Sequence, residues 1–467
     1  MNRTFFLLLG LIVAFLGGCT LAPTYTRPEA PVPAAWPGGP AAGPQAVKPG
    51  EAAADTPWRD FFVDERLRQV IDLALANNRD LRVAALNVQR TQALYRIQRA
   101  ELLPSVNAGA TFSKERVPGI ISQNNQPATV ELYNVNLGIS SWELDLFGRI
   151  RGLKDAALEQ YLATEQARAS AQISLVSEVA NTYLTLAADR ENLKLAQSTL
   201  ETQRSTYEMI RRRAEVGTSS DLDLREAQTR VDAARVDIAR YTSQVALDEN
   251  ALTLLVGSPV PPGLLPVELG EVAPLRDFTP GLPSEVLQRR PDIIQAEHQL
   301  KATHANIGAA RAAFFPRITL TTSIGTTSGQ LSGLFMSGSE TWAFVPQITV
   351  PIFDARTWAA YDVTKVDREI ALAQYEKAIQ TGFREVSDAL AQRATLGDQL
   401  QAQQSLVDAS SESYRLSDAR YTRGIDSYLR VLDAQRSLYG AQQGLISIRL
   451  ARLTNLVTLY KVLGGGA

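Results

Sequence analysis

The chain has 467 residues, a formal net charge of −2 at pH 7, one cysteine and two histidines. This near-neutral charge balance argues against a nucleic-acid partner, which would require a basic face. One cysteine and two histidines are too few for a zinc or redox site of a usual kind, so we expect no metal and no cofactor.

The first 18 residues are predicted to be a lipoprotein signal peptide. Arg3 precedes an apolar run from Phe5 to Leu16, which is too short to cross a bilayer as a helix. Small residues stand directly before Cys19, as in the lipobox of bacterial lipoproteins, so we expect cleavage before Cys19 and lipid attachment to it. Thr20, in place of an aspartate, is typical of lipoproteins sent to the outer membrane, whose lipid is therefore an expected partner. The alternative is an ordinary signal peptide with an incidental cysteine.

Residues 19–57 form the next segment, which is rich in Pro, Ala and Gly and has no periodicity. This composition predicts an extended arm behind the lipid anchor. Two structural repeats are predicted after the arm, in residues 58–262 and 263–467. Each repeat contains helices, two strands and a long helical hairpin.

Three pairs of matching segments define the internal repeat, at an offset of about 207 to 212 residues. The first pair is a helix ended by proline and then a strand, the second is a strand that leads into a long helix, and the third is a glycine followed by a helical seam. The pairs are 80–106 with 292–318, 144–149 with 350–356, and 217–241 with 424–448. Each seam alternates spacings of three and four, which is the period of a coiled coil.

Two long helices are predicted, over residues 150–216 and 356–423, because neither stretch contains proline. At a rise of about 1.5 Å per residue, each would be roughly 100 Å long, far more than a globular domain needs. Gly217 and Gly424 are suited to end these helices.

Four segments alternate apolar and polar residues, which predicts four strands with one apolar face each. Their apolar residues are Val106, Ala108, Ala110 and Phe112; Tyr133, Val135, Leu137 and Ile139; Ile318, Leu320 and Ile324; and Trp342, Phe344, Ile348 and Val350. Polar loops are expected between them over residues 113–131 and 326–340. Such strands occur in membrane β-barrels with a watery lumen, and also in water-soluble sandwiches.

Four strands do not close a barrel around a lumen, and an open edge in lipid leaves backbone groups unpaired at several kcal/mol each. A membrane barrel must therefore be shared between subunits. Two copies would contribute eight strands, which side chains nearly fill, whereas three would contribute twelve and leave room for a channel. The predicted fold is mainly α with a β-barrel section: a long, coiled-coil-like α-helical barrel plus a shared twelve-stranded transmembrane β-barrel, with two internal repeats per chain.

Six motifs spread over the chain carry a family resemblance. They are Cys19-Thr20-Leu21-Ala22-Pro23, Trp142-Glu143-Leu144-Asp145-Leu146-Phe147-Gly148-Arg149, Arg289-Arg290-Pro291-Asp292, Ala312-Ala313-Phe314-Phe315-Pro316, Val431-Leu432-Asp433-Ala434-Gln435-Arg436 and Gly464-Gly465-Gly466. With these motifs the chain resembles the TolC-type outer-membrane factors, especially the lipoprotein branch typified by OprM.

The resemblance implies a homotrimer in the cell outer membrane that extends into the periplasm. It also implies docking on a periplasmic adaptor protein and an inner-membrane pump of the RND type, as the exit duct of a tripartite efflux system for drugs or other small molecules. The tips of the helical hairpins would dock the adaptor. These tips are Gly217, Thr218, Ser219, Gly424, Ile425 and Asp426.

Leu429 and Asp433 match the family positions that narrow the closed periplasmic mouth, and Glu226 is the repeat counterpart of Asp433. Leu429 and Asp433 are four residues apart and so share one helix face. Three copies of Asp433 around a three-fold axis would form an acidic ring, with Leu429 as an apolar collar. A solvated helix face outside any pore is the alternative for both residues.

Two other functions fit the same elements. A channel for type I protein secretion would use this fold with a different inner-membrane partner, and a non-conducting envelope-spanning scaffold would need only the coiled-coil seams. We expect no enzymatic activity and no catalytic residues, because Glu143 and Asp145 have no nearby histidine, cysteine or metal set. We predict that these two carboxylates make structural polar pairs.

Overall fold

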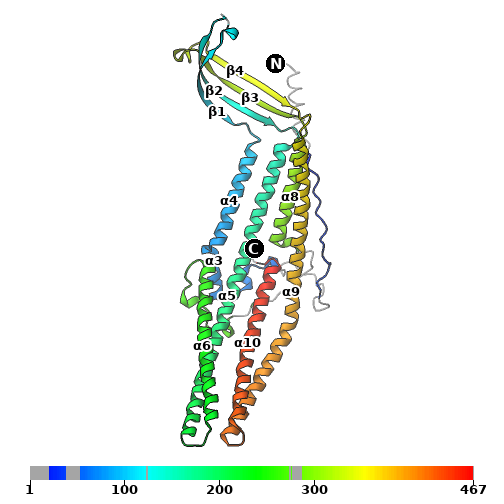
Figure 1. Cartoon of the computed structure of the whole chain (residues 1–467). Helices are drawn as coiled ribbons and strands as arrows, with labels where there is room; N and C mark the ends of the chain where they lie inside the picture. Colours follow the sequence, from blue (N-terminus) through cyan, green and yellow to red (C-terminus); the bar gives the residue numbers. More distant parts are fainter. Residues whose placement is uncertain (1–19, 38–52, 123–124, 273–274, 276–286, 466–467) are drawn as a thin grey trace. The chain divides into compact units, whose positions relative to one another are not determined.

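The computed structural model describes residues 20–37, 53–122, 125–272, 275 and 287–465 (Figure 1). Its main helices and strands are α2 (Trp58–Phe61), α3 (Glu65–Asn77), α4 (Arg79–Ala100), β1 (Val106–Val117), β2 (Ala128–Leu144), α5 (Arg149–Glu215), α6 (Asp221–Val256), α8 (Pro291–Ala312), β3 (Arg317–Ser328), β4 (Glu340–Thr349), α9 (Ala355–Thr422) and α10 (Tyr428–Val462). The order helix, two strands and two helices thus occurs twice. The two long helices α5 and α9 begin and end within one residue of their predicted bounds.

The chain divides into two compact units, which we call the strand unit and the helical unit. Of the described residues, those within 20–28, 88–164 and 296–375 form the strand unit, and those within 29–87, 165–295 and 376–465 form the helical unit. Among the helices that the structure describes, none combines the length and the apolar character required to traverse a bilayer.

The strand unit contains one antiparallel sheet with the order β1-β2-β3-β4 (Figure 1). Phe112 of β1 lies opposite Tyr133 of β2. Further across the sheet, Leu137 lies opposite Ile324, which in turn lies opposite Trp342. Directly opposed residues project from the same face of a sheet. The four predicted apolar faces therefore form one continuous surface.

The strands are longer than predicted at their loop ends. We expected loops over residues 113–131 and 326–340, but β1 continues to Val117, β2 begins at Ala128 and β3 continues to Ser328. Lys114 and Glu131 face each other across β1 and β2 and form an ion pair of 2.6 Å. The predicted loop boundaries were wrong because polar residues, which do not show the apolar alternation, continue the pairing between the strands.

A β-bulge in β2 changes which residues face the apolar side. The pairing with β3 shifts register between Ile139 and Trp142, and Ser141 has a φ of +52°. Odd-numbered residues lie on the apolar face before the bulge, whereas Trp142 and Leu144 lie opposite Leu320 and Ile318 after it. The extra residue keeps the apolar surface continuous to the end of the strand.

The helical unit has a large core formed by α2, α3, α5, α6, α9 and α10. At its centre, Phe61 stacks on Tyr460 with ring centroids 4.1 Å apart, and Phe62 contacts both rings edge-on. The hydroxyl of Tyr460 donates to the carbonyl of Thr56 at 2.5 Å, so its only polar atom is satisfied inside the core.

The first described residues of the N-terminal arm, as far as Arg27, lie against the part of α8 that belongs to the strand unit. The carbonyl of Leu21 accepts a hydrogen bond from Arg311 at 3.2 Å, and Arg27 binds Glu297 through two nitrogens at 3.1 and 2.7 Å. Gly308 is required for this approach, because a Cβ there would lie 2.8 Å from Ala22. The predicted signal peptide and Cys19 lie outside the described residues.

Candidate functional site: hairpin turns and sheet

Both long helices end in the same type of turn. Gly217 and Gly424 each have a φ of +73°, a left-handed conformation that glycine adopts without a steric penalty. The closing hydrogen bonds run from Thr218 N to Arg213 O at 2.8 Å, and from Ile425 N to Arg420 O at 2.9 Å. Bonds over this span satisfy carbonyls that the helix end leaves free. The predicted helix ends at both glycines are therefore present in the structure.

The two turns differ in their side-chain hydrogen bonds, and only the first caps the next helix with a side chain. In the first, Ser220 and Asp223 form a capping box at the start of α6, and Ser219 also donates to Asp223 at 3.2 Å. Burial raises the pKa of Asp223, but the hydrogen bonds from both serines lower it by more, so that its pKa lies below the ordinary value. In the second turn, Asp426 instead accepts two hydrogen bonds from Arg420, which lowers the pKa of Asp426.

Two of the three candidate gate residues, Leu429 and Asp433, lie on the exposed side of α10. Leu429 is 53% exposed, and the side chain of Asp433 is also 53% exposed. Asp433 accepts a hydrogen bond from Arg436 at 3.3 Å. Glu226 on α6 is half-buried, and its carbonyl accepts a bond from Thr229. Among the described residues, no hydrogen bond joins Glu226 to Asp433.

A tyrosine-rich cluster, which the sequence did not predict, joins the two hairpins behind Leu429 and Asp433. Its buried members are Ile210, Ala227, Tyr428, Val431 and Leu432, with Tyr207, Leu224, Tyr414 and Tyr421 packed around them. Arg213 of α5 donates to the hydroxyl of Tyr421 of α9 at 3.0 Å. Leu224, Ala227 and Val431 lie in the predicted seams, and Tyr207 and Tyr414 are repeat counterparts, but neither signal places the tyrosines together.

The sheet presents its apolar face outward from the single chain. Ile324, Trp342 and Phe112 on this face are 67%, 77% and 56% exposed. Within the described sheet, β1 and β4 each pair on one side only, which leaves two edges with unpaired backbone groups.

A cluster of ion pairs fixes the junction between β2 and α5. Glu143 binds Arg149 at 2.8 Å and Arg317 at 2.5 Å, while Asp145 binds Arg151 at 3.2 Å. The side chains of both acids are less than a tenth exposed. The predicted structural pairing of Glu143 and Asp145 is therefore confirmed.

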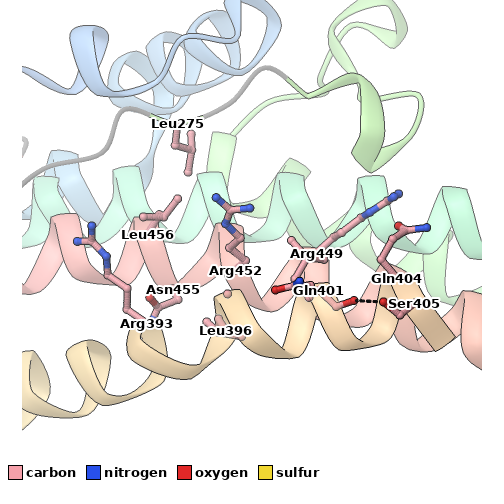
Figure 2. Close-up of a pocket in the computed structure, with 12 residues that line it drawn as sticks. Leu275, Arg393, Leu396, Gln401, Gln404, Ser405, Arg449, Arg452, Asn455 and Leu456 are labelled. Carbon is pink, nitrogen blue, oxygen red and sulfur yellow. Dashed lines mark hydrogen bonds between the residues drawn. The ribbon is translucent and has the colours of Figure 1, made fainter. Parts of the chain in front are cut away.

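A groove with a volume of about 650 Å³ lies in the helical unit. Figure 2 shows Arg449 and Arg452 extending into it from α10 and Arg393 from α9, with Leu275 across the groove. Arg449 also lies 3.7 Å from Glu191. The described lining offers guanidinium and amide groups but no carboxylate, histidine or cysteine that could act as a base.

Comparison with known proteins identifies the family. A sequence profile described as "Outer membrane efflux protein" matches residues 70–258 and 282–465, which is most of the chain. The chain belongs to the outer membrane efflux protein family. The predicted resemblance and fold class are thereby confirmed.

Named relatives and a solved structure agree with this assignment. The toluene efflux pump outer membrane protein TtgC of Pseudomonas putida is 52% identical over 458 residues, covering 97% of this chain and 94% of TtgC. OprJ, an outer membrane protein of Pseudomonas aeruginosa, is 44% identical over 98% of this chain and 95% of OprJ. The open state of the Neisseria gonorrhoeae outer membrane channel MtrE superposes with a TM-score of 0.87 at 39% identity, over 96% of this chain and 98% of MtrE.

These similarities give this efflux family protein its general role and location. It is an efflux channel protein of the outer membrane that extends into the periplasm, as predicted. The family and the relatives are channels, and the part of the chain that the structure describes contains no group of three or more metal-ligating His, Cys, Asp or Glu residues.

Proposed function

We propose that three copies of the chain assemble into one duct through which a tripartite pump exports small organic compounds. The observation that carries this proposal is the sheet, whose apolar face is exposed and whose two edges are unpaired in the single chain. Apolar side chains facing lipid are stable, but free backbone groups in lipid are not. Edge-to-edge pairing between copies removes both free edges at once.

The number of copies follows from the size of the lumen. Eight strands from two copies would form a barrel that side chains nearly fill, whereas twelve strands from three copies leave an open channel. The opposite face of the sheet supports a watery lumen, because its central residues include Asn134, Asn136, Thr319, Thr321 and Ser323. The name of TtgC specifies toluene, which supports small organic molecules as the exported class.

We further propose roles for the N-terminal arm and for the hairpin turns. Cys19 would carry the lipid anchor, and the arm that follows it is held on α8 by Arg27 and Arg311. The two hairpin turns at Gly217 and Gly424 would contact a periplasmic adaptor that connects the duct to an RND-type pump. Leu429 and Asp433, with Glu226 in the first repeat, would line the periplasmic constriction.

Single-channel recording of the purified oligomer in planar bilayers tests this function. The wild type should conduct ions, and replacing Leu429 and Asp433 with alanine should increase conductance and weaken block by added divalent cations, because an acidic ring attracts cations. Asp232→Ala is a matched control. Asp232 is similarly exposed and pairs with Arg235 three residues later at 3.2 Å, as Asp433 pairs with Arg436.

Three outcomes are informative. Absence of conductance in a folded wild-type trimer would refute the duct. Conductance that Leu429→Ala and Asp433→Ala leave unchanged would remove these residues from the constriction. An equal increase in Asp232→Ala would show that any lost acid on these helices has the same effect, and it would also remove Asp433 from its proposed role.

A further inference from the structure

Two carboxylates face each other between α5 and α6 in the helical unit. Asp189 of α5 and Asp248 of α6 lie within hydrogen-bonding reach, and Asp248 is only 8% exposed. Neither acid forms an ion pair with lysine or arginine among the described residues. Asp189 is half-buried, and two carboxylates in contact at such a place repel each other unless one of them carries a proton.

The hydrogen bonds around the pair point to one shared proton. Oδ1 of Asp248 accepts from the amide of Gln244 at 3.3 Å, whereas Oδ2 is buried and accepts from no protein donor in the described structure. A protonated Asp189 supplies the missing donor. Burial, followed by the contact with Asp248, raises the pKa of Asp189 to about 6. Since buried acceptors are nearly always satisfied, the protonated form accounts for the geometry.

The surrounding charges do not neutralise the pair. Asn192 donates to Asp189, and Arg240 of α6 acts on it from a distance, and both oppose the rise of its pKa. Arg240 itself is bound to Asp237 at 2.9 Å. The other charged residues beside the pair are also engaged: Arg190 binds Glu249 at 2.7 Å, Lys194 binds Glu268 at 2.7 Å, and Glu191 lies 3.7 Å from Arg449 of α10.

The second repeat has no titratable group at the same place. The counterparts of Asp189 and Asp248, 207 residues further on, are Leu396 and Asn455, which are both buried. Asn455 donates to the carbonyl of Ala389 at 3.0 Å and to Gln392 at 3.2 Å. At the same place between the two helices, the α9–α10 hairpin therefore has an amide and the α5–α6 hairpin has an acid pair.

We propose that Asp189 and Asp248 form a proton-dependent latch between α5 and α6, and that no equivalent latch joins α9 and α10. The direction of the pH dependence follows from the raised pKa of Asp189. Its contribution to the packing of α5 on α6 is complete below a pH of about 4, the unfolded value, and is lost as the pH rises through about 6. Above that pH Asp189 loses its proton, and the repulsion between the two acids loosens this hairpin alone.

Amide hydrogen exchange of the intact oligomer tests the latch without any transport assay. After correction for the intrinsic pH dependence of exchange, peptides around Asp189 and Asp248 should exchange about tenfold faster at pH 8 than at pH 5. A rise in the pKa of Asp189 from about 4 to about 6 would change the exchange rate by roughly a hundredfold, and the partial exposure of Asp189 reduces this factor. Peptides around Leu396 and Asn455 serve as the internal control and should show no such change.

Asp248→Asn copies the residue of the second repeat and supplies a permanent donor to Asp189. The pH-dependent difference should disappear in this variant, and protection at pH 8 should rise to the value at pH 5. Asp189→Asn should act in the same way, which guards against misfolding of either variant. The latch is refuted if α5–α6 and α9–α10 change equally with pH in the wild type, or if both Asn variants fold and keep the wild-type pH dependence.

Discussion

Removal of Arg290 is expected to destabilise the helical unit far more than removal of its neighbour Arg289. Arg290 is 6% exposed and lies directly before α8. Its guanidinium binds Asp292 and Glu385, each at 2.7 Å, and donates to the carbonyl of Val462 at 2.8 Å. One side chain thus connects the start of α8, the middle of α9 and the C-terminal end of α10.

The size of the expected loss in stability follows from how deeply each ion pair is buried. Breaking a buried ion pair by removing one partner costs about 3–5 kcal/mol, because the remaining charge is left uncompensated. The side chains of Asp292 and Glu385 are 38% and 35% exposed, so water partly compensates them, and we expect about 3 kcal/mol for Arg290→Ala. Arg289 and Asp55 are 51% and 42% exposed, and Arg289→Ala should cost about 0–1 kcal/mol.

Denaturant-induced unfolding of the detergent-solubilised protein, monitored by helical circular dichroism, gives the free energy of unfolding for both variants. A double-mutant cycle isolates the charge effect. Adding Glu385→Gln to Arg290→Ala removes one unpaired carboxylate and should recover about 1 kcal/mol. Equal losses for Arg290→Ala and Arg289→Ala, or no recovery by Glu385→Gln, would refute the reasoning.

Two further predictions concern the sheet and the anchor. Gly325→Val should prevent assembly on native gels, because its Cβ would lie 2.1 Å from the carbonyl of Val135, whereas Gly109→Ala should assemble normally, since its Cβ meets only the side chain of Asn136 at 3.5 Å. Cys19→Ser should abolish metabolic labelling with radioactive fatty acid, and full labelling of this variant would contradict the lipoprotein prediction.

The sequence predicted those features that depend on local periodicity. The absence of proline and the positions of Gly217 and Gly424 gave the bounds of α5 and α9 to within one residue. Alternation identified all four strands, because each has one apolar and one polar face. Pairing between subunits could be argued from the strand count, since an open edge in lipid is unstable whatever the residues are.

Features that depend on contacts between distant segments were not predictable. The partners of Arg290 are up to 172 residues away, and the tyrosine-rich cluster combines residues from four helices. The acid pair Asp189 and Asp248 comes from two helices whose relative rotation the seam alone does not specify. Alternation also cannot reveal the bulge in β2. The extra residue moves the apolar face from odd-numbered to even-numbered positions, and the prediction assumes that this pattern is unbroken.

The repeat is a reliable guide to backbone but not to chemistry. Gly217 and Gly424 share the same φ and the same closing bonds, so the two turns have one conformation. The polar groups beside them differ. Asp433 is exposed and bound to Arg436, whereas its counterpart Glu226 is half-buried, and Thr229 occupies the place of Arg436. Since the two acids have different burial and different partners, Glu226 should contribute less than Asp433 to any acidic ring, and the two repeats should not act equally at the constriction.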